Sequence, residues 1–253
     1  INVGSYEQTL KIYTITKNNG IREVDWIRNR LDLGGTFATG KLSHEVMDEL
    51  CAVLRNFVSI MEGYRGDDYR ACATSAIRET KNTAIVLDQI MQRTGVKLDV
   101  LSNSEQRFLD YKSIASRGGF EKIIEKGTLV LDIGGGSIQM SLFDKDKLSA
   151  TQNMRLGVLR LQEKMSRLNV RPSENGPLLE ELLEAQLSVF RKMYLKDRVI
   201  ENIIVVDDYI SALILGKLGK VAGSGYLDRD SMASYMNYLH DHTDMEIVRY
   251  FDT

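Results

Sequence analysis

Cysteine and long apolar runs are the two most informative shortages in this chain. The sequence has two cysteines, Cys51 and Cys72, and no CxxC motif. Two separated cysteines do not make the disulfide framework of a small secreted protein, so we expect free thiols in a reducing compartment. No apolar run reaches the roughly 18–20 residues that a membrane-spanning helix needs, and no signal peptide opens the chain. We therefore expect a cytoplasmic protein with no membrane partner.

An excess of charge of either sign is also missing. The 33 lysines and arginines are opposed by 35 aspartates and glutamates, which leaves a net charge of −2. Such a chain has no overall field that attracts nucleic acid, so we expect no nucleic-acid partner, and any polyanion must be held by a local site. The 253 residues, 43% of them hydrophobic, suffice for one large or two smaller globular domains.

The hydrophobic pattern alternates between the period of a strand and that of a helix. Apolar residues at three- and four-residue spacing predict helices, with Ser43 and Ser104 as N-caps of two of them. Short apolar runs predict strands. The predicted helices are 43–64, 82–96, 104–118, 178–195 and 210–219, and predicted strands lie within 1–15, 68–79, 97–102, 127–144 and 202–208. This rhythm indicates an α/β fold with sheets covered by helices.

Two predicted hairpins indicate an internal repeat. INVG at 1–4 and LDIG at 131–134 each end a predicted strand in a glycine turn. We therefore expect two duplicated halves, a first domain over 1–122 and a second over 123–253. The chain begins inside a predicted strand and ends before the last strand and helix that such a second half needs. We expect residues to be missing from both ends, and the second domain to be incomplete at its C-terminus.

The stretch VLDIGGGSIQMSL (130–142) places Gly134, Gly135 and Gly136 between two predicted strands. Three consecutive glycines are expected where the backbone must approach something closely or where φ is positive. The N–H groups of such a turn form an electropositive nest for phosphate oxygens, to which Ser137 adds a hydroxyl donor. Asp132 beside that anion is suited to hold Mg²⁺. The alternative is a tight hairpin that binds no ligand.

Three separated stretches carry a family resemblance: CATSAIRETKN (72–82), VLSNSEQRFLDYKSIA (100–115) and LVLDIGGGSIQMSLF (129–143). A fourth, MRLGVLRLQEKM (154–165), resembles the segment that follows them in the same family. In this order and spacing they resemble the Ppx/GppA family of exopolyphosphatases and guanosine pentaphosphate phosphohydrolases. The resemblance covers roughly residues 1–165. It implies the actin-like (ribonuclease H-like) fold, in which two duplicated α/β domains surround an inter-domain cleft.

The resemblance also implies an activity, the Mg²⁺-dependent release of terminal phosphate from inorganic polyphosphate or guanosine pentaphosphate. The two glycine turns would grip the phosphate chain, and an arginine would bind it through charge-assisted hydrogen bonds. The expected phosphate-binding residues are Gly4, Ser5, Tyr6, Arg78, Gly134, Gly135, Gly136 and Ser137, and the expected metal ligand is Asp132. The expected ligand is therefore inorganic polyphosphate or (p)ppGpp. The oligomeric state stays open, a homodimer included.

Three amides stand where the family has carboxylates. The family's proton acceptor is the second glutamate of a Glu-Glu pair, which here reads Glu105-Gln106. Gln106 therefore occupies the catalytic position but cannot take a proton at neutral pH, although an amide can orient water. Asn2 and Gln139 are the other two replacements. Glu105 is the candidate substitute base, although a shift of one residue turns a helical side chain by about 100°.

These replacements leave two functions open. The first is a phosphohydrolase of the Ppx/GppA type, impaired by the loss of carboxylates. The second is a catalytically weak or inactive regulator that binds polyphosphate or (p)ppGpp. A kinase of the same fold is a poorer match, because it needs a second glycine-rich loop where this chain has VVDDYIS, with Asp207 and Asp208.

Overall fold

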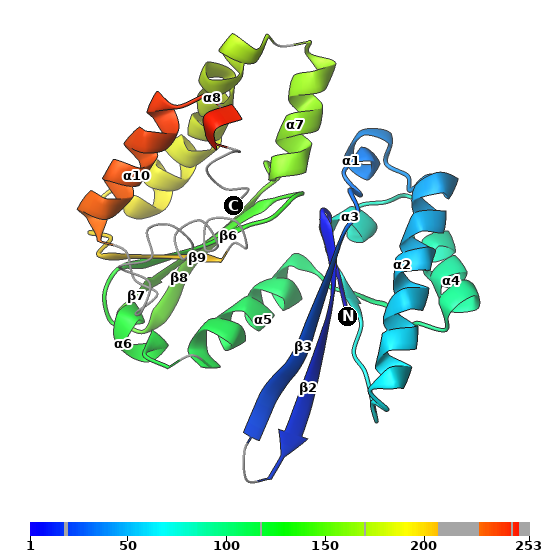
Figure 1. The fold of residues 1–253 in the computed structure, drawn as a ribbon. Helices are drawn as coiled ribbons and strands as arrows, with labels where there is room; N and C mark the ends of the chain where they lie inside the picture. The colour runs from blue at the N-terminus through cyan, green and yellow to red at the C-terminus, as the bar shows by residue number, and fades with distance from the viewer. Residues whose placement is uncertain (18–19, 117, 170, 207–227, 244, 248–253) are drawn as a thin grey trace. The chain divides into compact units, whose positions relative to one another are not determined.

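The computed structural model describes most of the chain, and Figure 1 draws it as a ribbon. The chain divides into two compact units, Ile1–Val205 and Val206–Thr253. The larger unit contains two β-sheets, which we call the first sheet (β3-β2-β1-β4-β5) and the second sheet (β8-β7-β6-β9). The described residues are 1–17, 20–116, 118–169, 171–206, 228–243 and 245–247.

The first sheet joins a long hairpin to short parallel strands. β1 runs antiparallel to β2 and parallel to β4, and β4 runs parallel to β5. The sequence analysis missed β3, because its charged and largely exposed residues show no apolar face. The strands are β1 (Asn2–Val3), β2 (Glu7–Thr16), β3 (Gly20–Arg30), β4 (Cys72–Ala73) and β5 (Asp99–Val100).

Four helices accompany the first sheet, and two of them bury an apolar stripe in its core. The N-cap Ser43 accepts a hydrogen bond from the N–H of Val46, and Gly95 ends α4 in the left-handed conformation, both as predicted. Leu50 and Phe57 of α2 are fully buried. The helices are α1 (Gly35–Thr39), α2 (His44–Gly63), α3 (Ser75–Arg78) and α4 (Thr83–Thr94).

The second sheet follows, with the predicted glycine hairpin as its centre. β6 and β7 are antiparallel, and β7 pairs with β8, a strand that the sequence analysis did not predict. The strands are β6 (Thr128–Ile133), β7 (Ile138–Asp144), β8 (Lys147–Met154) and β9 (Asn202–Val206). The helical segments are α5 (Asn103–Ser116), α6 (Phe120–Ile124), α7 (Val158–Arg167), α8 (Pro172–Phe190) and the π-helix η1 (Arg191–Leu195).

The two faces of the second sheet differ in polarity. Leu142 of β7 lies with Phe190 of α8 in an apolar cluster. Gln139 and Ser141, which alternate with the apolar positions of β7, are buried and polar. The hydroxyl of Tyr111 in α5 bonds to Ser141 at 2.6 Å. The face toward α5 is therefore the one that carries polar chemistry.

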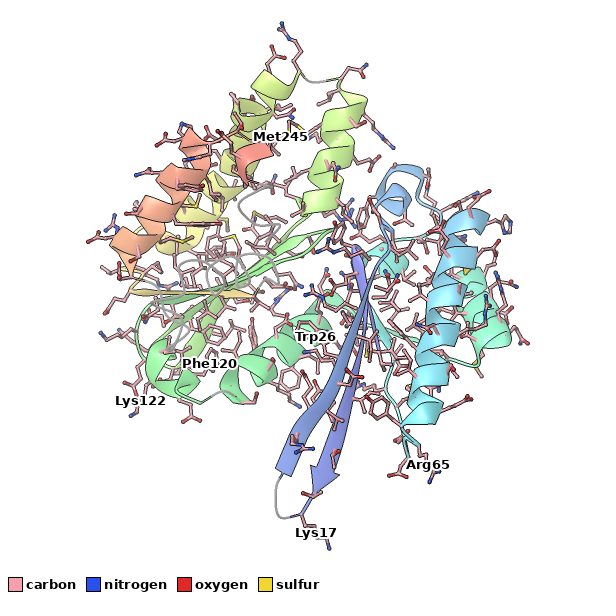
Figure 2. All side chains as sticks on the ribbon, viewed as in Figure 1. Lys17, Trp26, Arg65, Phe120, Lys122 and Met245 are labelled. Atoms are coloured by element: carbon pink, nitrogen blue, oxygen red, sulfur yellow. The ribbon has the colours of Figure 1, made fainter. Side chains whose placement is uncertain are left out.

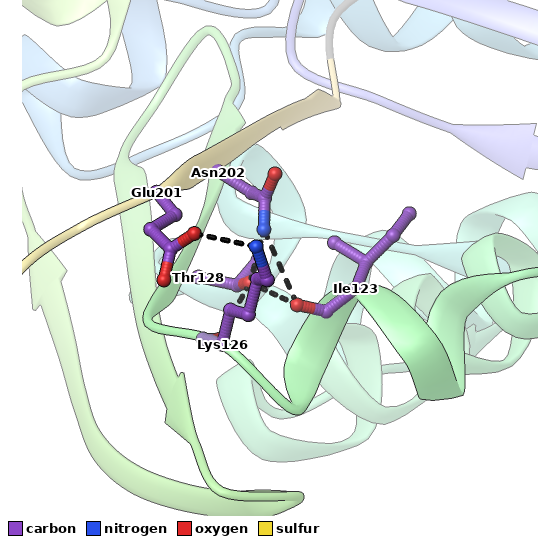
Figure 3. A network of polar contacts seen from close by, with 5 residues as sticks. All are labelled: Ile123, Lys126, Thr128, Glu201 and Asn202. Atoms are coloured by element: carbon purple, nitrogen blue, oxygen red, sulfur yellow. Dashed lines mark hydrogen bonds and ion pairs between the residues drawn. The ribbon is translucent and has the colours of Figure 1, made fainter.

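A network of polar contacts links β9 to the segment before β6, as Figure 3 shows. The amide of Asn202 donates to the carbonyl of Ile123 at 3.3 Å and to the hydroxyl of Thr128 at 3.4 Å. The ammonium group of Lys126 forms an ion pair with Glu201 at 2.7 Å. These contacts attach β9, at the edge of the second sheet, to the segment from Ile123 to Thr128.

β2 and β3 extend beyond β1 as a two-stranded ribbon, with Lys17 beyond the end of β2 (Figure 2). Trp26 on this ribbon is 42% exposed. The charged ends of Lys11 and Arg28 lie 4.4 and 4.8 Å from the centre of its ring. These cation–π contacts stabilise the exposed ring.

The smaller unit contains α10 (Arg229–Asp241), whose first turn is capped by Asp228. The predicted helix 210–219 and the pair Asp207 and Asp208 lie outside the described residues. Among the residues that are described, no helix combines the length and the apolar character needed to cross a bilayer. Cys51 and Cys72 are both free, as predicted.

The predicted repeat is visible in the strand pairing. In the first sheet Asn2 pairs with Thr9 and Val3 with Gln8. In the second sheet Asp132 pairs with Gln139, and Ile133 with Ile138. The two hairpins thus have the same register around a four-residue turn. The boundary between the duplicated halves at 122/123 stays a prediction.

Candidate phosphate site

The two glycine turns have the same internal hydrogen bond. The N–H of Gly4 donates to the carbonyl of Glu7 at 2.9 Å, and the N–H of Gly134 donates to the carbonyl of Ser137 at 2.9 Å. The turns are also neighbours, because a Cβ atom on Gly135 would lie 3.0 Å from the Cβ atom of Ser5. The structure therefore brings together the two turns that the sequence placed in separate halves.

Close approach, and not a positive φ, explains the run of glycines. Neither Gly135 nor Gly136 is among the described glycines with positive φ. A Cβ atom on Gly136 would lie 2.5 Å from the ring of Phe37 and 2.5 Å from the hydroxyl oxygen of Ser75. Phe37 and Ser75, which belong to the half of the chain that contains the first sheet, thus pack directly against the glycine turn of the second sheet.

The carbonyl groups of the glycine turn are bonded to the start of α7. The N–H groups of Val158 and Leu159 donate to the carbonyls of Gly134 and Gly135 at 3.1 and 2.9 Å. The Nε of Arg160 donates to the carbonyl of Gly136 at 2.9 Å. These bonds also satisfy N–H groups that the first turn of a helix leaves unpaired.

The N–H groups of the same turn are left without partners. Within the described part of the chain, no hydrogen bond is formed by the N–H groups of Gly135, Gly136 or Ser137. Ser137 itself is buried, and the buried hydroxyl of Ser5 bonds to that of Ser75 at 2.8 Å. In a turn, consecutive backbone N–H groups can form an anion-binding nest, which is the role predicted for this one.

Asp132, at the end of β6, is the centre of a polar network. The amide nitrogens of Gln106 and Gln139 each donate to the same carboxylate oxygen of Asp132, at 3.0 Å in both cases. Gln139 also accepts a bond from the Nε of Arg107 at 3.4 Å. Two of the three amides expected at carboxylate positions, Gln106 and Gln139, therefore bind the carboxylate that is the expected metal ligand.

Asp110 belongs to this network, and the sequence analysis missed it. It lies one turn after Gln106 on α5 and is hydrogen-bonded to Asp132. Burial raises the pKa of the Asp110 carboxyl to about 7; the charge of Asp132 and the hydrogen bond between the two carboxyl groups add to the rise, and Arg107 opposes it. Oδ2 of Asp110 is buried and has no hydrogen-bond partner among the described residues. The spacing of four residues from Gln106 was the available signal.

Glu105 caps the N-terminus of α5. Its carboxylate accepts a bond from the N–H of Ser102 at 2.8 Å, and its own N–H donates to the hydroxyl of Ser102 at 3.2 Å. This reciprocal pair is a capping box, with Ser102 as the N-cap. The prediction of Ser104 as the cap was therefore wrong: the helix begins a residue earlier, at Asn103, and the glutamate three residues after Ser102 completes its cap.

Arg78, an expected phosphate ligand, is the last residue of α3. Its Nη1 donates to the carbonyl of Leu101 at 2.6 Å. Its Nη2 is buried and has no hydrogen-bond partner in the part of the chain that is described. Burial lowers the pKa of the guanidinium group. The other predicted phosphate contact, Tyr6, is partly buried in the turn of the first sheet.

A second group of charges lies beside the glycine turn and was not predicted. Arg160 forms an ion pair with Glu79 at 2.7 Å and lies 4.2 Å from the ring centre of Phe37. Arg155 approaches the same carboxylate oxygen of Glu79 only to 3.8 Å. Contacts between positions so far apart in the sequence leave no periodic signal.

The expected metal site contains two carboxyl groups. Within the described ranges, no group of three or more His, Cys, Asp or Glu side chains could hold a metal ion. Mg²⁺ is commonly held by one or two carboxylates together with water and substrate phosphates. The unpaired oxygen of Asp110 beside Asp132 fits that smaller donor set, with Gln106 and Gln139 in place of further anions.

Comparison with known proteins identifies the family of the chain. Residues 18–211 match the model of the Ppx/GppA phosphatase family, and the chain belongs to that family. It is 27% identical over 154 residues to exopolyphosphatase 1 of Mycobacterium leprae, which covers 60% of this chain and 44% of the relative. It is 26% identical over 142 residues to a guanosine-5'-triphosphate,3'-diphosphate pyrophosphatase of Photobacterium profundum, covering 56% of this chain and 28% of the relative. The match thus spans less than half the length of either relative.

A solved structure shows the fold. The Ppx/GppA family member of Aquifex aeolicus superposes with a TM-score of 0.73 at 20% identity, over 99% of this chain and 81% of that one. The predicted α/β class with actin-like duplicated halves is confirmed.

Proposed function

We propose that this protein binds condensed phosphate at the glycine turn and hydrolyses its terminal phosphoanhydride slowly. The observation that carries the proposal is the turn itself. Its carbonyl groups are bonded to α7 and Arg160, while the N–H groups of Gly135, Gly136 and Ser137 are unbonded in the described part of the chain. A phosphate supplies the acceptors that these donors lack. The names of the exopolyphosphatase and pyrophosphatase relatives support inorganic polyphosphate or a guanosine polyphosphate as the ligand.

The residues around the turn divide the work of such a reaction. The nest orients the terminal phosphate, and Arg78 offers its unpaired Nη2 to an oxygen elsewhere on the phosphate chain. Gln106 can orient the attacking water through its amide. Asp132 and Asp110 would hold Mg²⁺, which when bound neutralises charge on the phosphate oxygens. Glu105, occupied in the capping box, is a poor candidate for the base.

A regulator that binds the same ligand without useful turnover is the second candidate. One observation favours it, since the amides of Gln106 and Gln139 donate to the carboxylate oxygen that a metal or a water would otherwise contact. A general base typically contributes roughly 10²–10⁴-fold to a rate, and an amide cannot supply that contribution. The same glycine turn serves both candidates.

The deciding experiment is phosphate release from polyphosphate, with and without Mg²⁺, by the unaltered protein and by Gln106→Glu. We expect the variant to be at least about tenfold faster, because a carboxylate can take the proton of water. The gain should require Mg²⁺, since a further anion beside Asp132 and Asp110 needs a cation to offset the repulsion. Gln92→Glu, which adds the same charge on an exposed part of α4, is the matched control and should change nothing.

Two results would count against the enzyme. Binding of polyphosphate with no release by either protein would favour the regulator. Failure of both proteins to bind any phosphate would mean that the turn is only structural. The cytoplasmic location expected from the free cysteines is part of the same proposal and is tested by cell fractionation.

A further inference from the structure

Two arginines, Arg155 and Arg160, lie close to Glu79 beside the glycine turn, and only Arg160 is fully used by the fold. Arg160 bonds to Gly136, pairs with Glu79 and packs against Phe37. Its side chain is largely buried, at 20% exposure. Arg160 therefore holds the turn and neutralises Glu79.

Arg155 is held much more loosely. Its side chain is 72% exposed, and its ion-pair partner among the described residues, Glu79, is 3.8 Å away. That separation is longer than a hydrogen bond, and the carboxylate is already paired with Arg160. Surface ion pairs of this kind contribute little to stability. The fold thus gains little from the cation at position 155.

Arg155 nevertheless lies beside a backbone segment that packs on the turn. It lies two residues before Gly157, which contacts the backbone of Gly135 and Ser137 so closely that a Cβ atom would overlap both. The positive charge of Arg155 is also close enough to Arg78 to add to the lowering of the Arg78 pKa. Two guanidinium groups against one carboxylate leave one positive charge in excess at Glu79 among the described residues.

We propose that Arg155, together with the unpaired Nη2 of Arg78, binds the second phosphate of a condensed phosphate chain whose terminal phosphate lies in the glycine nest. The inference rests on the proposed function and defines its ligand class. That class is a chain of at least two phosphoanhydride-linked groups, whether inorganic or attached to a nucleoside. Guanidinium groups suit this role because their planar donors match phosphate oxygens.

The test measures dissociation constants for orthophosphate, pyrophosphate, tripolyphosphate and guanosine tetraphosphate by calorimetry. We expect Arg155→Ala to weaken tripolyphosphate and pyrophosphate binding roughly 10- to 100-fold, the effect of losing a hydrogen bond to a charged group. Orthophosphate binding should change less than about twofold. Arg155→Lys should recover part of the affinity, because lysine keeps the positive charge but lacks the planar pair of N–H donors of a guanidinium group. The guanosine ligand should weaken equally if its diphosphate occupies the nest.

Arg171→Ala is the matched control, since Arg171 is a similarly exposed arginine in an ion pair, with Glu174. Equal weakening by Arg155→Ala and Arg171→Ala would reduce the effect to net charge and overturn the inference. So would equal losses for orthophosphate and tripolyphosphate. If the unaltered protein binds condensed phosphate and Arg155→Ala binds it as tightly, the inference fails alone. If the unaltered protein binds none of the four ligands, the proposed function fails with it.

Discussion

Asp110 and Asp132 determine the charge of this site. Gln106 and Gln139 are neutral, so the negative charge of the network rests on these two carboxyl groups. Burial and the proximity of Asp132 raise the pKa of Asp110 to about 7, which keeps a proton in the pair near neutral pH. The pair is therefore sensitive to pH in the range where the protein would work.

Asp110→Asn should make the protein more stable at pH 8. An unfolded aspartate titrates near 4, whereas Asp110 in the folded chain titrates at about 7. The folded state thus binds more protons between these values, and stability falls as the pH rises from about 4 to about 7. The variant loses this decline. In thermal melts without divalent metal, its advantage should grow from near zero at pH 4, on the scale of about 2–4 °C for each kcal/mol.

Asp88→Asn is the control for that melt, because Asp88 is an exposed aspartate on α4. It should show no such growth with pH. An advantage of Asp110→Asn that is the same at pH 4 and pH 8 would contradict the assignment of the raised pKa to Asp110.

At the scale of the element, α5 places Gln106 and Asp110 beside Asp132, and its first turn depends on Ser102. Ser102→Ala removes the hydroxyl that accepts from the N–H of Glu105. Loss of a serine N-cap typically costs about 1 kcal/mol, so the melting temperature should fall by about 2–4 °C. Ser104→Ala is the matched control and should leave it unchanged, because Ser104 is exposed inside the helix. A larger fall in melting temperature for Ser104→Ala than for Ser102→Ala would refute the capping box.

These elements also show what the sequence could predict. The Ser43 cap, the Gly95 terminus and the two glycine hairpins have local signatures, and each was predicted correctly. β3 was missed because it has no buried face, so hydrophobic alternation could not mark it. The choice of Ser104 over Ser102 ignored a local signal that was present, the glutamate three residues after Ser102.

The site was predictable only where its residues lie in motifs. The sequence motifs predicted one catalytic site that contains Asp132, Gln106 and Gln139. In the structure both amides donate hydrogen bonds to Asp132. The pairing of Glu79 with Arg160 joins parts of the chain that share no pattern, so only the folded structure could reveal it. The phosphate roles of the two turns and of Arg78 stay predictions.

For the molecule as a whole, the glycine turn links the halves that carry the two sheets. Phe37 and Ser75 from the first half contact Gly136 of the second, and Arg160 bonds to both Gly136 and Glu79. A small change at Gly136 should therefore affect the stability of the larger unit and not only the turn.

Gly136→Ala should destabilise the protein, because its Cβ atom would lie 2.5 Å from both the Phe37 ring and the Ser75 hydroxyl oxygen. Overpacking of this kind typically costs about 1–3 kcal/mol, which urea unfolding would measure as a lower midpoint. Gly63→Ala is the matched control: Gly63 ends α2, and a Cβ atom added there would meet nothing within 4 Å, so the added methyl should be neutral or stabilising. Gly136→Ala should also bind orthophosphate more weakly, since the turn must shift to relieve the overlap. An unchanged midpoint together with lost phosphate binding would mean that Gly136 makes room for a ligand and not for the other half of the protein.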